Sequence, residues 1–260
     1  MSFEIKDFTM DFFSLKGKVA MVTGGTTGLG QGYAIALAKA GADVFVACYN
    51  SDYAETKAMV EAEGVKFGFI QCDLSKRENV NASIEACMKE FGRIDILVNN
   101  AGMIRRNSLF ESTDEDWKAV IDLNMNAVYY LSLEAAKIMD KQGGGKIINI
   151  ASMLSFQGGI RVPSYTASKH GVAGITKAFA NELAAKNIQV NAIAPGYIAT
   201  ANTAPIRADE ARNASILARI PAERWGAPFD VMGAVVFLSG KASDYITGHI
   251  LAVDGGWLVR

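Results

Sequence analysis

Short apolar runs rich in β-branched residues alternate with longer amphipathic stretches along this 260-residue chain. Strands that are apolar throughout are typically buried on both faces, and helical connections between them predict a parallel sheet covered by helices on both sides. We therefore expect one doubly wound α/β domain over residues 1–260, with its ligand site at the carboxyl ends of the strands. The seven expected strands are Val19–Thr23, Asp43–Cys48, Lys66–Gln71, Ile94–Asn99, Lys146–Ala151, Gln189–Ile193 and His249–Val253.

Helical patterns fill most of the gaps between these strands. One helix is expected over 28–40, and another begins at a capping signal and runs over 113–141, past Asn124. The phenylalanine-rich residues 1–15 predict an arm packed on the body or on a neighbouring subunit. Residues 197–220 lack strand character, and we interpret them as a mobile lid of short helices over the substrate.

Charge and composition exclude several classes of protein. The net charge is −1, so neither nucleic acid nor an anionic membrane is an expected partner. The best apolar run, 231–238, is far too short to cross a membrane, and residues 1–18 do not resemble a signal peptide. The widely separated Cys48, Cys72 and Cys87 predict small buried core residues and, with two histidines in the chain, no metal site. We expect a cytoplasmic protein.

A tyrosine and a lysine stand four residues apart at Tyr165 and Lys169. On a helix this spacing places both side chains on one face. A phenol has an ordinary pKa of ~10, and an adjacent ammonium favours the phenolate and lowers that pKa. The pair can therefore exchange a proton with a carbonyl or alcohol oxygen.

The first expected strand ends in a glycine-rich turn, Thr23 to Gly30, that leads into a helix. Such a turn lets the backbone approach a pyrophosphate, which the N–H groups at the helix N-terminus can bind. The spacing is Gly-x-x-x-Gly-x-Gly, which differs from the Gly-x-Gly-x-x-Gly pattern of the larger dehydrogenases. We interpret the turn as a dinucleotide site.

The second expected strand ends in Cys48, followed by Tyr49, where an acidic residue would bind the adenosine ribose of NAD. Neither an acid nor a base occurs there. A 2′-phosphate without a cation costs more than a ribose without a carboxylate, so NAD(H) is favoured and NADP stays possible.

Three further strand ends carry small or polar residues. These are Asn99 to Gly102, Ser152 and Pro195 to Thr200. Because parallel strands end at the same edge of a sheet, the Ser152 hydroxyl is expected near Tyr165, where it can bind the substrate oxygen.

Together these motifs, in their order and spacing, resemble the short-chain dehydrogenase/reductase family over nearly the whole chain. The resemblance implies a Rossmann-like domain, a homotetramer and a site in which Tyr165 is the acid/base and Lys169 lowers its pKa and holds the nicotinamide ribose. It also implies that Ser152 orients the substrate carbonyl and that Asn124 anchors a water. The cofactor contacts expected from the motifs and the resemblance are Gly24, Thr26, Thr27, Gly28, Leu29, Gly30, Tyr49, Asp73, Leu74, Asn100, Ala101, Gly102, Tyr165, Lys169, Pro195, Gly196, Ile198 and Thr200.

Within this family the chain is most similar to members that act on keto-deoxy sugar acids, in residues 144–165, in 220–226 and in the tail 253–260. The likeness implies that 2,5-diketo-3-deoxygluconate is reduced at C5 in uronate breakdown. A sugar acid carries a carboxylate, which arginine binds best. Arg105, Arg106 and Arg161 lie on loops that should border the site, and at least one is expected to contact the substrate. The residues expected to bind substrate are Ser152, Arg105, Arg161 and Gln157. Gln157 and Trp225 are the weaker candidates for lining the pocket.

Other activities remain open at this level. Gluconate 5-dehydrogenase and 3-oxoacyl reductase activities are close alternatives, although a reductase of carrier-bound substrates needs a basic docking surface that a nearly neutral sequence does not predict. A dinucleotide-sensing protein without catalysis is a further alternative. The complete set of Asn124, Ser152, Tyr165 and Lys169 argues against it.

Overall fold

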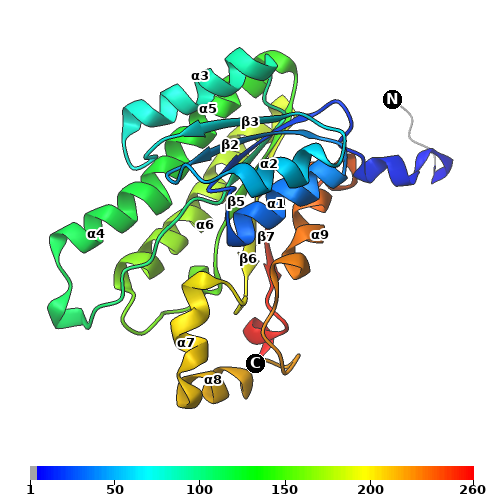
Figure 1. Cartoon of the computed structure of the whole chain (residues 1–260). Coiled ribbons are helices and arrows are strands. Elements are labelled where there is room, and N and C mark those ends of the chain that lie inside the picture. The colour runs from blue at the N-terminus through cyan, green and yellow to red at the C-terminus, as the bar shows by residue number, and fades with distance from the viewer. Residues whose placement is uncertain (1–4) are drawn as a thin grey trace.

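The computed structural model describes residues 5–260, which contain a seven-stranded, entirely parallel sheet in the order β3-β2-β1-β4-β5-β6-β7. The expected doubly wound sheet is therefore confirmed. Two of its strands have the predicted bounds, and the other five differ from them by one or two residues at the ends. Figure 1 shows the sheet between two layers of helices. The strands are β1 (Val19–Thr23), β2 (Asp43–Cys48), β3 (Phe67–Gln71), β4 (Ile96–Asn99), β5 (Gly145–Ile150), β6 (Ile188–Pro195) and β7 (Ile250–Val253).

Alternate residues of each strand enter two different hydrophobic cores, as the two-residue period of a strand requires. In β1, Ala20 and Val22 pack toward α1 and α9, while Val19 and Met21 pack toward α3 and α5. Burial on both faces explains why these strands are apolar throughout. The helices that cover the sheet are α1 (Gly28–Lys39), α2 (Ala54–Glu61), α3 (Arg77–Phe91), α4 (Asp114–Ile121), α5 (Ala127–Gln142), α6 (Pro163–Leu183) and α9 (Pro228–Ser239).

The three cysteines are free thiols in this fold. Cys48 and Cys87 are buried as expected, whereas Cys72 is half-buried. Among residues 5–260, no group of three or more acidic, histidine or cysteine side chains could hold a metal ion.

The long helix expected over 113–141 is present but contains an irregular turn. Its N-terminus is capped by Thr113, whose hydroxyl accepts a hydrogen bond from the backbone N–H of Asp116 at 3.1 Å. Between α4 and α5 the backbone forms a π-helical segment, Asp122–Asn126. A π-turn is uncommon, but it is frequent at functional sites. The hydrophobic periodicity of the sequence cannot predict it.

Short helices follow β6 beside the carboxyl ends of the strands. They are a 3₁₀-helix (Ala201–Thr203), α7 (Ala204–Ala208) and α8 (Glu210–Leu217), and they lie at the bottom of Figure 1. Ile216 and Ile220 pack against Met153 and Trp257 of the body. We refer to residues 197–220 as the 197–220 segment, and its mobility stays a prediction.

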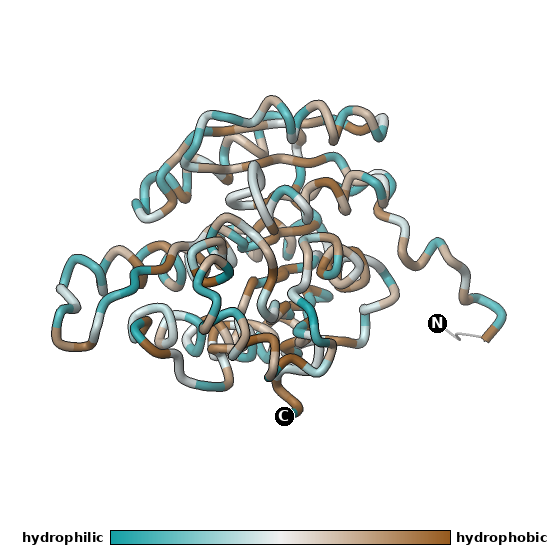
Figure 2. Tube along the Cα trace, turned by 60° about the horizontal axis from the view of Figure 1, so that its bottom comes forward, coloured by the Kyte–Doolittle hydropathy of each residue, from teal (hydrophilic) through white to brown (hydrophobic). Residues whose placement is uncertain are grey.

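The N-terminal arm expected over residues 1–15 is described only from residue 5, so residues 1–4 lie outside the described residues. Two 3₁₀ turns, Ile5–Asp7 and Met10–Phe13, form the described part, which Figure 2 shows extending from the body. The ring of Phe13 lies 6.4 Å from that of Phe237 on α9, which anchors the end of the arm. Within the part of the chain that the structure describes, no helix is long and apolar enough to cross a membrane.

Candidate active site

One cavity of about 600 Å³ opens at the carboxyl ends of the strands, between the sheet and the 197–220 segment. Its walls come from the turns after β1, β4, β5 and β6, from α6 and from the chain around α8. This is where a doubly wound sheet places its ligand. The predicted residues that line it are Gly24, Thr27, Gly28, Leu29, Gly30, Asn100, Gly102, Ser152, Gln157, Tyr165, Lys169, Gly196 and Thr200.

The glycine-rich turn is tight, and two of its glycines have backbone angles that other residues rarely adopt. Gly24 and Gly28 have φ values of +65° and +56°, in the left-handed region that favours glycine. A Cβ on Gly30 would lie only 2.0 Å from the carbonyl oxygen of Gly24, so no other residue fits there. The turn then opens directly into α1, whose first N–H groups are available to an anion.

The end of β4 is attached to this turn by hydrogen bonds. The Asn100 amide nitrogen donates to the carbonyl oxygens of Thr23 and Gly24, at 2.9 and 3.1 Å. The Thr23 hydroxyl in turn accepts from the backbone N–H groups of Asn100 and Ala101, both at 3.0 Å. These contacts hold two strand ends together at the floor of the cavity.

Tyr165 and Lys169 lie near the start of α6, which begins at Pro163. Both face the same side of the helix, because the Lys169 Nζ lies 5.5 Å from the centre of the Tyr165 ring. Lys169 is 5% exposed and donates to the carbonyl oxygen of Ile150 at 2.6 Å. Ser155 donates to the carbonyl oxygen of Lys169 at 2.7 Å, so the turn after β5, which carries Ser152, is attached to α6.

The environment of these groups sets their charge states. Burial raises the pKa of Tyr165, and this outweighs a hydrogen bond with Ser152 and the charge of Arg106, both of which lower it. The sequence predicts a lowered Tyr165 pKa, so the direction found here is the opposite. Burial also lowers the pKa of Lys169 to about 8. At neutral pH Tyr165 is therefore a protonated phenol, and Lys169 is mostly an ammonium.

Asn124 lies behind the cavity wall and does not line it. Its side-chain oxygen accepts from the backbone N–H of Met103 at 2.8 Å, and its nitrogen donates to the Met103 carbonyl at 2.9 Å and to Ser168 at 3.3 Å. The residue is completely buried in the π-helical segment. In this geometry the amide holds the turn after β4 against α6.

The remaining predicted residues lie outside this cavity. Thr26 is buried beside Cys48, with 3.2 Å between its hydroxyl oxygen and the thiol sulfur, and Tyr49 is 72% exposed. Thr26 belongs to the turn after β1, whereas Tyr49 directly follows β2. The predicted residues that do not line the cavity are Thr26, Tyr49, Asp73, Leu74, Ala101, Asn124, Arg105, Arg161, Pro195, Ile198 and Trp225.

A family profile described as enoyl-(acyl carrier protein) reductase matches residues 24–258. The 2-dehydro-3-deoxy-D-gluconate 5-dehydrogenase of Bacillus subtilis (strain 168) is 58% identical over 250 residues, which cover 96% of this chain and 98% of that protein. The chain belongs to the short-chain dehydrogenase/reductase family.

Solved structures of short-chain dehydrogenases/reductases have the same fold. One from Agrobacterium tumefaciens, provisionally described as a 2-deoxy-D-gluconate 3-dehydrogenase with bound NADP, is 51% identical with a TM-score of 0.88. The match covers 95% of this chain and 99% of that one. Another from Beutenbergia cavernae, provisionally described as an NAD(P)-dependent gluconate 5-dehydrogenase with NADP at low occupancy, is 44% identical. Its TM-score is 0.91, and the match covers 95% of this chain and 99% of that one.

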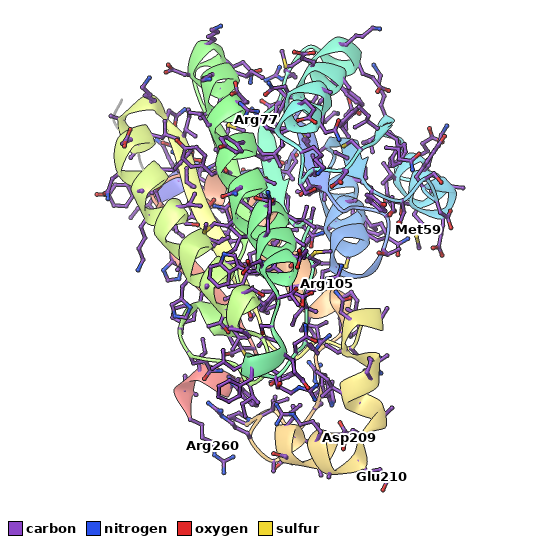
Figure 3. The ribbon with its side chains drawn as sticks, turned by 90° about the vertical axis from the view of Figure 1, so that its left-hand side faces the viewer. Met59, Arg77, Arg105, Asp209, Glu210 and Arg260 are labelled. Atoms are coloured by element: carbon purple, nitrogen blue, oxygen red, sulfur yellow. The ribbon has the colours of Figure 1, made fainter. Side chains whose placement is uncertain are left out.

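Of the three arginines that the sequence predicts beside the site of this short-chain dehydrogenase/reductase, Arg106 lines the cavity and Arg105 and Arg161 do not. Arg105 is exposed and lies 3.8 Å from Asp116 in an ion pair; Figure 3 shows it apart from Asp209 and Glu210. Arg161 also lies outside the cavity, whereas its walls contain Arg106, Arg212 and Arg219. Arg106 directly follows Arg105 in the sequence, so the motif after β4 points to it. No motif in the sequence distinguishes Arg212 and Arg219 from other surface arginines.

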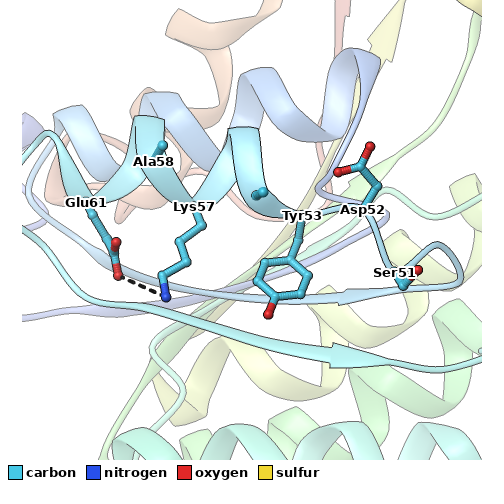
Figure 4. A pocket seen from close by; sticks show the side chains of 7 residues that line it. Ser51, Asp52, Tyr53, Lys57, Ala58 and Glu61 are labelled. Atoms are coloured by element: carbon cyan, nitrogen blue, oxygen red, sulfur yellow. Dashed lines mark ion pairs between the residues drawn. The ribbon is translucent and has the colours of Figure 1, made fainter.

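A second hollow, of about 470 Å³, lies beside α2 and contains none of the predicted residues. Ser51, Asp52 and Tyr53 form one end, and Figure 4 shows Lys57 paired with Glu61 at the other, at 3.8 Å. It is an open part of the surface in this member of the family, next to the end of β2.

Proposed function

We propose that this protein reduces a keto sugar acid with a nicotinamide dinucleotide, and that its substrate is 2,5-diketo-3-deoxygluconate, reduced at C5 to 2-keto-3-deoxygluconate. One observation carries the proposal. Ser152, Tyr165 and Lys169 meet the glycine-rich turn in a single cavity that also contains three arginines. The names of the relatives agree with a sugar-acid substrate and with NADP in two of them.

The residues at the cavity floor fit a dinucleotide. A Cβ on Gly30 would collide with the Gly24 carbonyl oxygen, so glycine here keeps the turn tight and leaves the start of α1 open to the cavity. The N–H groups at the start of α1 would bind a pyrophosphate. Lys169 would hold the nicotinamide ribose, and Asn100, Gly102 and Thr200 would complete the site. When bound, this cofactor supplies the hydride that reduces the ketone carbon.

Tyr165 supplies the proton in this proposal. Reduction of the C5 ketone adds one hydride to carbon and one proton to oxygen. The raised pKa of Tyr165 keeps the phenol protonated at neutral pH, which suits a general acid in the direction of reduction. Ser152 orients the substrate oxygen, and Asn124 keeps the turn after β4 in place. The water-anchoring role of Asn124 remains part of the proposal.

The end of β2 favours NAD(H) over NADP(H). Cys48 is 8% exposed at the position where an acid would contact the ribose, and no lysine or arginine occurs in residues 49–53. The nearby Lys57 is paired with Glu61 (Figure 4). A 2′-phosphate would therefore lack a cation, although the NADP in related structures supports binding of both forms.

Reduction of 5-keto-D-gluconate is a second candidate function. It places the same carboxylate four carbons from the same C5 ketone, and the gluconate 5-dehydrogenase relative favours it. The same cavity residues would act in both reactions.

The deciding experiment is an absorbance assay of NADH and NADPH oxidation with 2,5-diketo-3-deoxygluconate, 5-keto-D-gluconate and one 3-oxoacyl thioester. We expect the highest kcat/KM with the first substrate and NADH. Tyr165→Phe should lower kcat by at least ~10²-fold, the usual size of a general-acid contribution. Tyr245→Phe, at a fully exposed tyrosine, is the matched control. Full activity of Tyr165→Phe would refute the assignment, and light scattering tests the expected homotetramer.

A further inference from the structure

Arg219 is a cation of the 197–220 segment that two other parts of the chain hold in place. Its guanidinium carbon lies 4.0 Å from the centre of the Trp257 ring, and its Nη2 donates to the Oε1 of Gln157 at 3.1 Å. Trp257 is 5% exposed, so it is a rigid base for the stack. All three residues line the cavity that contains Ser152 and Tyr165.

The charge of Arg219 is not neutralised by the protein. Among the described residues, 5–260, Arg219 forms no ion pair with a carboxylate, and neither do Arg106 and Arg212. Stacking on Trp257 uses the face of the guanidinium, whereas hydrogen bonds use its edge. With one N–H directed to Gln157, the others remain for a second acceptor, and a carboxylate matches that edge.

The two best-placed cations of the cavity lie in different surroundings. Arg106 is close enough to Tyr165 to affect its proton equilibrium, so it belongs to the reacting end. Arg219 instead contacts Gln157 and Trp257, on the wall that also contains Ile216. A six-carbon acid that reacts at C5 has its carboxylate at the far end of the chain from the ketone. With Arg106 beside Tyr165 and Arg219 beside Gln157 and Trp257, the two arginines would serve different ends of such a substrate.

We propose that Arg219 binds the substrate carboxylate, and that Gln157 and Trp257 are positioning residues that hold its guanidinium toward the cavity. This inference rests on the proposed function, because it concerns how the same site selects an acid. Arg219 already connects the 197–220 segment to Gln157 in the turn after β5 and to Trp257 in the C-terminal tail. A substrate carboxylate bound to Arg219 would add a further contact between this segment and the rest of the protein.

The test compares 2,5-diketo-3-deoxygluconate with its neutral carboxamide for wild type, Arg219→Met and Gln157→Glu. Arg219→Met should raise KM for the acid by ~10-fold or more, the size expected for a hydrogen bond between charged groups, and leave kcat and the KM of the carboxamide within about twofold. Gln157→Glu should produce the same selective rise, because its new carboxylate would occupy the Arg219 edge. Arg219→Lys should recover part of the charge effect but not the bidentate contact.

Arg260→Met is the matched control, because Arg260 contacts the same segment through the Ala218 carbonyl at 3.2 Å but does not line the cavity (Figure 3). Equal changes for the acid and the carboxamide in Arg219→Met would overturn the inference, as would an unchanged KM for the acid. If wild type turns over no keto sugar acid, the proposed function itself fails. Unchanged cofactor Kd in every variant would show that the cofactor site is intact.

Discussion

Replacement of Lys169 by methionine should make the protein more stable at neutral pH while it removes activity. Burial lowers the pKa of Lys169 from 10.5 to about 8, so the folded state holds an ammonium at a cost. At about 1.4 kcal/mol per pKa unit, this depression corresponds to roughly 3 kcal/mol. Methionine has a similar length without the charge, but it leaves the Ile150 carbonyl without its donor, which costs about 1–3 kcal/mol. We expect the free energy of unfolding to rise by about 1 kcal/mol.

The stability difference between Lys169→Met and the wild type should depend on pH. Folded Lys169 loses its proton near pH 8, whereas a lysine in the unfolded chain keeps it until about 10.5. Between these values Lys169 binds more protons in the unfolded state, so its own contribution to the unfolding free energy rises with pH. Methionine does not titrate, so the stability advantage of Lys169→Met should shrink across this window.

Urea unfolding of the ligand-free proteins at several pH values between about 7 and 10 measures both effects. Lys177→Met is the matched control, because Lys177 is exposed on the same helix, and it should show no such narrowing. The turnover of Lys169→Met should fall by at least ~10²-fold, because the acid/base pair is broken. The reasoning is wrong if Lys169→Met is clearly less stable than wild type at neutral pH, or if the difference stays constant as pH rises.

Two further substitutions test the nucleotide site. Gly30→Ala should abolish dinucleotide binding and lower Tm, because its Cβ would lie 2.0 Å from the Gly24 carbonyl oxygen. Gly32→Ala on the same helix is the control and should do neither, because its Cβ would contact Pro228 at an ordinary 3.5 Å. Fluorescence titration with NADH and thermal unfolding check this, and NADH binding by Gly30→Ala at wild-type affinity would contradict it. Cys48→Asp should raise the preference for NADH over NADPH by ~10-fold or more, because the new carboxylate would repel the 2′-phosphate of NADPH. An unchanged ratio of the two kcat/KM values would mean that Cys48 does not lie near the adenosine ribose.

Many of the residues at the catalytic end of the site could be predicted from spacing, because their positions depend on regular elements. Strands that end at one edge of a parallel sheet bring Gly24, Asn100 and Ser152 to one cavity, and a four-residue interval places Tyr165 and Lys169 on one helix face. The first and last residues of the strands are harder to predict from the sequence. The buried Ile94 is apolar enough for a strand, but β4 begins at Ile96. The preceding residue, Asp95, is polar, and its carboxylate accepts from the backbone N–H of Val19 at 2.9 Å.

The order of apolar and amphipathic segments by itself determined the parallel α/β sheet. Each strand buries two faces and is apolar throughout, whereas each helix buries one face and is amphipathic, so both patterns can be recognised from neighbouring residues. The tertiary structure alone decided which arginines enter the cavity and in which direction the pKa of Tyr165 moves. Arg219 meets Gln157 across 62 residues of sequence. Desolvation of Tyr165 likewise depends on everything packed around it, and neither effect has a signature in neighbouring residues.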